Sequence, residues 1–135
     1  MNFCVNQLGR GHWIHIFPEG QVNMSKDFIR LKWGVGRLIY DSSLTPIVVP
    51  IWHIGFDEVL PNEPPYYLKF GKKITINFGS PIHLNHLIKQ MKFDNVSPVF
   101  ARKIITDLIH HELNSLQHET ENLHYAKGNL NIPPS

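Results

Sequence analysis

Apolar and polar side chains alternate along residues 13–17, the short run Trp-Ile-His-Ile-Phe. Alternation with a period of two is typical of a strand that buries one face. Glycines at positions 9 and 11 precede the run, and Pro18, Glu19 and Gly20 follow it, which is the composition of a turn. The pattern therefore predicts a strand that ends in a turn, with the carboxylate of Glu19 at that turn.

The hydrophobic period changes after Ser25, where apolar residues recur at spacings of three and four. This spacing predicts an amphipathic helix over residues 26–40, with an apolar stripe that includes Phe28, Leu31, Val35 and Leu38. Gly34 and Gly36 lie inside the predicted helix, where each glycine costs about 1 kcal/mol relative to alanine. Their presence indicates that another backbone or a ligand approaches this helix closely.

Residues 46–54 form a nearly continuous apolar run with β-branched side chains at its centre. Such a run is typical of a strand buried on both faces in a parallel sheet, so residues 13–54 predict a βαβ unit. Pro50 lies inside the run and removes one hydrogen-bond donor from the strand ladder. We expect a strand distorted near a site, at an edge or a bulge; the alternative is a strand that ends at Val49.

Short strands and two more helices are expected in the second half of the chain. Residues 66–70 and 73–78 are expected to be strands, and residues 84–91 a short helix. Ser97 followed by Pro98 has the composition of a helix N-cap and first helical residue, and the apolar spacing behind them predicts a helix to about Leu123. Residues 126–135 are expected to be a loose tail.

Composition indicates one globular domain. The chain has 135 residues, of which 42% are hydrophobic and 18% are charged, and these values are ordinary for a folded protein. A net charge of +2 with the histidines neutral is too small to indicate nucleic-acid binding, but it suits an anionic membrane surface. Charged residues and prolines interrupt the apolar region 28–54, so this region cannot span a bilayer as one helix, although it can lie on the membrane.

Three blocks resemble the later motifs of the glycerolipid acyltransferase superfamily: Phe17-Pro18-Glu19-Gly20, Leu31-Lys32-Trp33-Gly34 and Ile47-Val48-Val49-Pro50. Four residues alone recur by chance, whereas three linked blocks over residues 9–125 are a strong match. The longer stretches 17–25 and 31–39, together with residues 60–62 and 64–66, are similar to the C-terminal half of the tafazzin family.

The two residues that follow the first block distinguish the branches of this superfamily from one another. Other members follow the glycine with Thr and Arg, whereas Gln21 and Val22 stand here. A phosphate-reading arginine is therefore missing at this point, which fits the tafazzin family and argues against a glycerol-3-phosphate acyltransferase.

The resemblance implies an α/β fold, the C-terminal part of a glycerolipid acyltransferase fold, with a mixed or mostly parallel sheet flanked by helices and a C-terminal helix. Residues 1–125 would form a partial acyltransferase domain without its early strands. The activity implied is a phospholipid–lysophospholipid transacylase that remodels the acyl chains of cardiolipin without coenzyme A or another cofactor. The resemblance also implies a peripheral, interfacial position on mitochondrial membranes, with phospholipids and lysophospholipids as partners.

The superfamily's chemistry rests on a His-x4-Asp pair, in which histidine removes the proton of the acceptor hydroxyl and aspartate orients the imidazole. None of the nine histidines has aspartate at the fifth following position. His53 comes nearest, with Asp57 four and Glu58 five positions on, but it follows the Phe-Pro-Glu-Gly motif whereas the family's pair precedes it. We therefore assign no catalytic residue, expect the pair upstream of Met1 and expect the chain alone to be inactive.

The resemblance assigns substrate-binding roles to the first block. Glu19 would accept hydrogen bonds from the glycerol hydroxyl of the acceptor lipid or steady the surrounding loop; the alternative is a carboxylate favoured at a helix N-terminus. Gly20 would allow a close backbone approach, or only a turn with positive φ. The same resemblance adds further residues to the substrate site: Phe17, Pro18, Lys32, Gly34 and Pro50.

Basic and aromatic residues near the second block are candidates for lipid contact. Lys32 matches the family position for holding a lipid phosphate, while a solvated basic helix face is the alternative. On a helix Arg30 would diverge from Lys32 by about 160°, so the two could not hold one phosphate. Trp33, Arg37 and Trp52 are candidates for the membrane surface, and burial in the core is an equal alternative for the two tryptophans.

No metal site is expected from the histidines. His12 and His15 would lie on opposite faces of a strand, and His83 and His86 lack a second pair of ligands at suitable spacing. A second class of function stays open beside the transacylase. It is a non-catalytic lipid-binding module of the membrane surface, or a short isoform, on the same scaffold.

Overall fold

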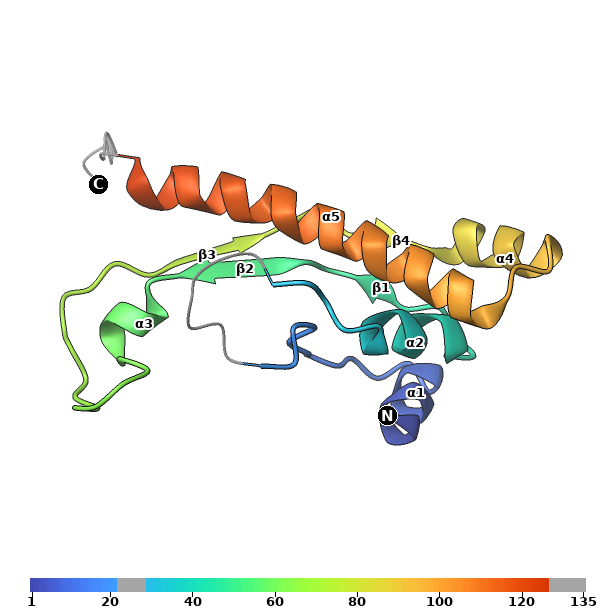
Figure 1. Ribbon diagram of the computed structural model, residues 1–135, viewed down its shortest axis with the longest axis horizontal. Helices are drawn as coiled ribbons and strands as arrows, with labels where there is room; N and C mark the ends of the chain where they lie inside the picture. The colour runs from blue at the N-terminus through green and yellow to red at the C-terminus, as the bar shows by residue number, and fades with distance from the viewer. Residues whose placement is uncertain (22–28, 127–135) are drawn as a thin grey trace, which may run out of the picture.

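A long C-terminal helix and a two-stranded β ribbon organise the computed structural model, which describes residues 1–21 and 29–126. Helix α5 (Pro98–Tyr125) runs along one side of the ribbon, and the N-terminal part of the chain lies on the other side (Figure 1). One side of the ribbon is formed by β1 (Ile47–Val48) and β2 (Ile51–Ile54), and the other by β3 (Thr75–Phe78) and β4 (Ile82–His83). Shorter helices complete the fold: α1 (Asn2–Gly9), α2 (Gly34–Asp41), α3 (Phe56–Val59) and α4 (Asn85–Phe93).

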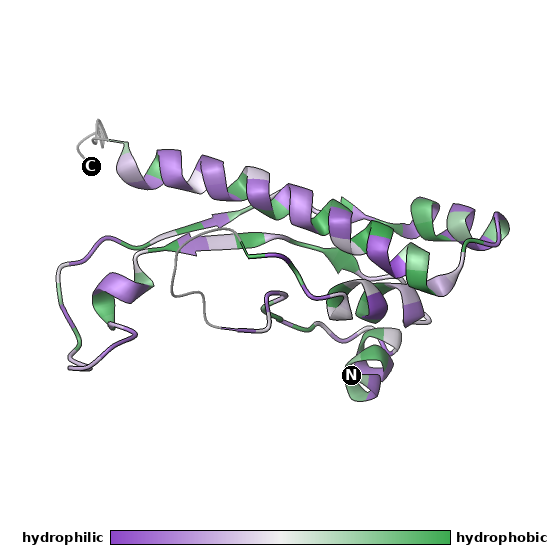
Figure 2. Cartoon of the chain, viewed as in Figure 1, coloured by the Kyte–Doolittle hydropathy of each residue, from purple (hydrophilic) through white to green (hydrophobic). Residues whose placement is uncertain are grey.

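Helix α5 begins where the sequence predicts. The Ser97 hydroxyl accepts a hydrogen bond from the backbone N–H of Phe100 at 3.4 Å, and Pro98 is the first helical residue. Figure 2 shows apolar positions interspersed with hydrophilic ones along α5, as expected for a helix with one buried side. The buried apolar positions keep helical spacing: Ala101, Ile105, Ile109, Leu113 and Leu116. The predicted helices near residues 84–91 and 98–123 are therefore confirmed as α4 and α5.

The β ribbon is antiparallel. Strand β1 pairs with β4 and β2 with β3, so that Ile51 lies opposite Phe78 and His53 opposite Ile76. Side chains along both strands alternate between exposed and partly buried positions, and α5 packs on the partly buried face. The α/β class with a C-terminal helix is confirmed. The expected βαβ unit and parallel sheet are wrong, because both strand pairs are antiparallel. The expected burial of residues 46–54 on both faces is also wrong, because a continuous apolar run can leave one apolar face uncovered.

Pro50 lies at a bulge between the two paired segments. Two residues, Val49 and Pro50, face three residues, 79–81, of the opposite strand. The backbone N–H of Gly79 donates to the carbonyl of Pro50 at 2.9 Å and joins the two pairs. The expected distortion at Pro50 is confirmed as a bulge, where the missing N–H of proline is tolerated.

The predicted strand over residues 13–17 is wrong. These residues have no strand partner among the described residues, and the Trp13 side chain is 86% exposed. A strand needs a neighbour for its backbone N–H and C=O groups, so a correct alternating pattern is not sufficient to form one.

The predicted helix 26–40 is correct only in its second half. Helix α2 begins at Gly34, residues 29–33 are not helical, and residues 26–28 lie outside the described residues. The N–H of Lys32 donates to the carbonyl of Pro18 at 2.9 Å instead of to a carbonyl one helical turn earlier. The argument that Arg30 and Lys32 diverge by helical geometry therefore does not apply.

Strand prediction was also wrong for residues 66–70, which form a loop. The N–H of Lys69 donates to the carbonyl of Val59 at the end of α3, so this segment bonds a helix terminus rather than a strand. The predicted strand 73–78 is confirmed as β3. Helices α1 and α3 were not predicted, and neither contains a buried residue that would produce a hydrophobic period.

Helix α2 packs against α5 through Gly36. A Cβ atom at this position would overlap with the backbone carbonyl of Arg102 and would come within 2.5 Å of the Thr106 hydroxyl. The prediction that a glycine here marks the close approach of another backbone is confirmed. This contact belongs to the hydrophobic core, which combines residues from α2, α4 and α5, among them Val35, Ile39, Ile88, Met91, Ile105 and Ile109.

Candidate functional site

The Phe17-Pro18-Glu19-Gly20 motif forms a tight turn. The N–H of Gly20 donates to the carbonyl of Phe17 at 3.1 Å, and Gly20 has φ +67°. This backbone conformation favours glycine, because other L-residues meet a steric penalty there. The sequence prediction of a turn at Glu19 is therefore confirmed, although no strand leads into it.

Lys32 holds this turn at two points. Its backbone N–H donates to the carbonyl of Pro18 at 2.9 Å, and its Nζ donates to the carbonyl of Gly20 at 3.4 Å. The aliphatic part of the Lys32 side chain lies against Gly20, where a Cβ would come within 2.8 Å of Lys32 Cδ. Gly20 and Lys32 are twelve residues apart in the sequence, so backbone and side-chain contacts join the first two motif blocks in space.

Glu19 is the partly buried acid of the turn. Burial raises its pKa above the ordinary value of 4.5, and the nearby His53 opposes this rise through its charge. His53 lies on the exposed face of β2 and makes an edge-on ring contact with Phe56 at 5.0 Å between centroids. The Glu19 carboxylate is therefore partly shielded from solvent at the turn, and the charge of His53 on β2 acts on it.

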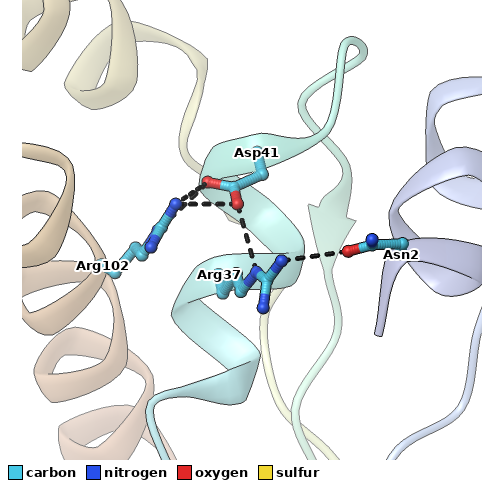
Figure 3. Close-up of polar contacts among 4 residues, drawn as sticks. All are labelled: Asn2, Arg37, Asp41 and Arg102. Atoms are coloured by element: carbon cyan, nitrogen blue, oxygen red, sulfur yellow. Dashed lines mark hydrogen bonds and ion pairs between the residues drawn. The ribbon is translucent and has the colours of Figure 1, made fainter.

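A cationic cluster lies close to the second motif block (Figure 3). Arg102 of α5 donates from Nε and Nη2 to the Asp41 carboxylate at 2.9–3.1 Å. Arg37 of α2 contacts the same carboxylate through Nε at 3.4 Å and donates from Nη2 to Asn2 Oδ1 at 3.0 Å. Two guanidinium groups thus share one carboxylate, and the cluster keeps a net positive charge.

The two arginines also line an open cavity of about 400 Å³. Its walls combine the arginines with Met1 before α1 and with groups at the start of α2 and α5: Trp33, Gly34 and Val99. The second motif block therefore contacts the turn through Lys32 and borders this cavity through Trp33 and Gly34. Cationic side chains beside apolar walls match the two parts of a phospholipid, a phosphate and a hydrocarbon chain.

Other residues expected at the site lie apart from the turn. Pro50 is buried on the α5 side of the ribbon, where it lines a cavity of about 160 Å³ with Glu112 and Glu119. Trp52 is partly buried and packs against the hydrophobic core, whereas Trp33 and Phe17 are exposed. The structure brings Phe17, Pro18, Glu19, Gly20 and Lys32 together, and the substrate role of each of these residues and of Pro50 stays a prediction.

Sequence reasoning missed Asp41 and Arg102 as neighbours of Arg37. The spacing of Arg37 and Asp41 is a visible signal, because residues four apart on a helix are neighbours. The contact of Asp41 with Arg102 joins positions 61 residues apart, and no local sequence pattern predicts it. The proximity of His53 to Glu19 was missed for the same reason.

Comparisons with known proteins connect this geometry to a family. The sequence model of the family named Acyltransferase matches residues 1–54, which include the turn, Lys32 and the first strands. Tafazzin of Drosophila melanogaster is 50% identical over 128 residues, which are 95% of this chain and 34% of that protein. The chain is homologous to tafazzin, and its first 54 residues match the Acyltransferase family.

Two other relatives support this assignment. A protein named taffazin from Dictyostelium discoideum is 32% identical over 70% of this chain and 35% of its own length. An N-acylphosphatidylethanolamine synthase from Arabidopsis thaliana is 50% identical over 63% of this chain and 32% of its own length. No solved structure matches the chain. The chain spans about a third of the length of the curated relatives it matches.

No helix within residues 1–21 and 29–126, which the structure describes, combines the length and the apolar character needed to cross a bilayer. The His, Cys, Asp and Glu side chains of the same residues form no group of three that could hold a metal ion.

Replacement of Glu19 by glutamine is expected to change the pH dependence of folding. Because burial raises the pKa of Glu19, the folded state binds this proton more tightly than the unfolded state does, and the stability of the wild type decreases as pH rises from about 4.5 through the raised pKa. Glu19→Gln removes the titrating group. Urea unfolding of both proteins at pH values from 4 to 8 should show the wild type losing free energy of unfolding relative to the variant across this window; parallel profiles would contradict the burial of Glu19.

Proposed function

We propose that this chain forms the acceptor-binding part of a phospholipid–lysophospholipid transacylase of the tafazzin type, which remodels cardiolipin acyl chains without coenzyme A. The observation that carries the proposal is the double contact of Lys32 with the Phe17–Gly20 turn. These contacts fix the turn and hold the Glu19 carboxylate in a partly buried position. Pre-positioned groups of this kind reduce the cost of orienting a substrate.

Glu19 would orient the acceptor. In acyl transfer, a lysophospholipid hydroxyl attacks the ester carbonyl of a donor phospholipid and loses its proton to a general base. The ester C–O bond of the donor then breaks, and the departing glycerol oxygen takes up that proton, so that the donor leaves as a lysophospholipid. A carboxylate oxygen of Glu19 can accept a hydrogen bond from that hydroxyl or from its glycerol neighbour. The base itself would come from outside these 135 residues, because no histidine in the chain has aspartate at the fifth following position.

The cavity beside α2 would receive the phosphate of a phospholipid. Arg37 and Arg102 line it with a net positive charge, and guanidinium groups bind phosphate oxygens in a paired geometry. Helices α2 and α5 both begin at this cavity and carry no acidic residue in their first turns, so their N-terminal dipoles also favour an anion. Trp33 and Val99 would contact the apolar part of the lipid.

The proposed location of the protein is the surface of mitochondrial membranes, to which it would attach at the interface without spanning the bilayer. The resemblance to the tafazzin family supports this location. Exposed aromatic side chains at the turn and the cavity, Phe17 and Trp33, support contact with the headgroup region, where aromatic rings are favoured.

A chimaera tests the activity. The segment of Drosophila melanogaster tafazzin that matches this chain is replaced by residues 1–135, and transfer of a labelled acyl chain from phosphatidylcholine to lysocardiolipin is measured on vesicles without coenzyme A. We expect transfer by the chimaera and a loss of about 100-fold or more on Glu19→Ala, the scale found when a positioning group of the transition state is removed. Glu63→Ala, which changes an exposed glutamate in the 60–65 loop, is the matched control and should keep full activity.

Other outcomes separate the competing functions. Equal transfer by the chimaera and its Glu19→Ala variant would remove Glu19 from the acceptor site. Vesicle binding without transfer would favour the non-catalytic lipid-binding module. Formation of an N-acyl product on phosphatidylethanolamine, with no product on lysocardiolipin, would replace the hydroxyl acceptor by an amine, as the name of the Arabidopsis relative states for that protein.

A further inference from the structure

The β ribbon carries an apolar face that the described residues do not fully cover. Helix α5 packs on one face of the ribbon, and on the opposite face the large apolar side chains are between 36% and 63% exposed: Ile47, Val49, Ile51, Ile76 and Phe78. Ile51 and Phe78 are direct cross-strand partners, so their side chains emerge on the same face. Scattered exposed apolar residues are ordinary, but a contiguous group from two paired strands marks an interaction surface.

This outer face is on the same side of the ribbon as the candidate site. Helix α5 covers the other side, and the N-terminal part of the chain, which carries the turn, lies on the side away from α5 (Figure 1). His53 lies opposite Ile76 in the β2–β3 ladder and belongs to the exposed row, and its charge acts on the Glu19 carboxylate. A partner that covers the face would therefore approach from the side of the proposed acceptor site.

We propose that the outer face of the β ribbon is the docking surface for the remaining part of an acyltransferase domain of the tafazzin type. This inference rests on the proposed function and names the partner that completes its site. The Drosophila relative matches 95% of this chain with 34% of its own length, so about two thirds of that protein has no counterpart here. A partner of that size is sufficient to cover the apolar row and to bring catalytic groups to Glu19.

The conformation of residues 13–17 supports the same partner. This segment has the alternating pattern of a strand, directly precedes the turn and has no strand partner in the described residues. Within the described residues, the only backbone hydrogen bond of this segment is the one that the Phe17 carbonyl accepts from Gly20. The N–H and C=O groups before it can therefore pair with a strand from another part of the domain, because a strand without a neighbour leaves such groups open. A lipid surface would cover the apolar row but would offer no strand to this segment.

Co-expression tests the docking surface directly. The full chain, carrying an affinity tag, is produced together with the part of Drosophila melanogaster tafazzin outside the matched segment. The molar mass of the purified complex is then measured by light scattering. We expect a 1:1 complex with the wild type. Phe78→Asp should reduce the recovered complex at least tenfold, because it places a charge among the apolar side chains of the outer face.

A second phenylalanine provides the matched control. Phe70 is 92% exposed in the loop before β3, so Phe70→Asp makes the same chemical change away from the face and should leave complex formation unchanged. Ile47→Asp is the second test on the face and should act like Phe78→Asp. Far-UV circular dichroism and urea midpoints of each tagged chain show whether a loss of binding is a loss of folding.

Several results would overturn the proposal. These are the absence of a complex with the wild type, equal complex formation by Phe78→Asp and Ile47→Asp, or an effect of Phe70→Asp as large as theirs. A homodimer of the chain that Phe78→Asp dissociates would assign the face to a second copy, and vesicle binding lost on Phe78→Asp without any complex would assign it to a lipid surface. A complex that forms but transfers no acyl chain would refute the proposed activity and leave the docking surface intact.

Discussion

Gly36→Ala is expected to lower the free energy of unfolding by about 1–3 kcal/mol, the cost of overpacking a well-packed contact. The added methyl group would overlap with the backbone carbonyl of Arg102, and a backbone atom of α5 cannot move aside as the end of a side chain can. Helix α2 must therefore shift away from α5. Urea unfolding followed by circular dichroism measures the loss, and alanine's higher helix propensity offsets only about 1 kcal/mol of it.

Gly34→Ala is the matched control in the same helix. A Cβ at Gly34 meets only the terminal methyl of Met1, at 2.9 Å, and this flexible group can rotate away. We expect Gly34→Ala to be neutral or slightly stabilising. Equal midpoints for the Gly34 and Gly36 variants would contradict the close approach of α2 to α5.

Local signals predicted α4 and α5 well. The cap formed by Ser97 and Pro98 and the apolar spacing that follows them determine α5 within a few residues. A capped helix satisfies its own backbone groups, so its signal is contained in neighbouring residues. The glycine at position 36 also carried correct information, because a costly residue inside a helix indicated a close contact before its partner, Arg102, was known.

Strand prediction failed where pairing depends on distant residues. Residues 13–17 have the alternation of a strand but no partner in the described structure, and residues 66–70 bond the end of α3 instead. The apolar run 46–54 contains β1 and β2, as its composition predicts, yet its sequence does not reveal that only one face of these strands packs on α5. The direction of strand pairing and the burial of the second face of a strand depend on tertiary contacts, and these contacts override local strand propensity.

The candidate site divides in the same way. The motif Phe17-Pro18-Glu19-Gly20 and Lys32 were identified from the sequence through the family resemblance, and the structure joins them by direct hydrogen bonds. The contact of Arg102 with Asp41 and the proximity of His53 to Glu19 link separate elements, so they required coordinates. Motif residues thus identify the turn, whereas the electrostatic surroundings of the turn come from the fold.

The link between α2 and the turn has a functional consequence. Lys32 holds the turn, and the next residues, Trp33 and Gly34, border the arginine-lined cavity. Because α2 is fixed on α5 through Gly36, the position of the cavity relative to Glu19 depends on that helix contact. A change in the α2–α5 packing is therefore expected to affect the proposed lipid binding as well as stability.

Ile105→Ala is expected to lower the free energy of unfolding by about 2–5 kcal/mol, the range found when a buried isoleucine is truncated. Ile105 is 0% exposed in the middle of α5 and belongs to the hydrophobic core with Val35 and Ile88. Three methyl-sized groups are lost, and a cavity remains because the surrounding helices cannot fully close it. The measurement is the urea midpoint at constant protein concentration, with the slope of the transition used to detect a change in cooperativity.

The matched control for this truncation is Ile76→Ala on the outer face of the ribbon. Ile76 is 50% exposed, so its loss should cost about 1 kcal/mol or less in the isolated chain. Far-UV circular dichroism at low urea should show both variants folded before their midpoints are compared. If Ile76→Ala were as damaging as Ile105→Ala, the outer face would already be buried in the isolated chain, and both the location of the core and the proposed docking surface would be wrong.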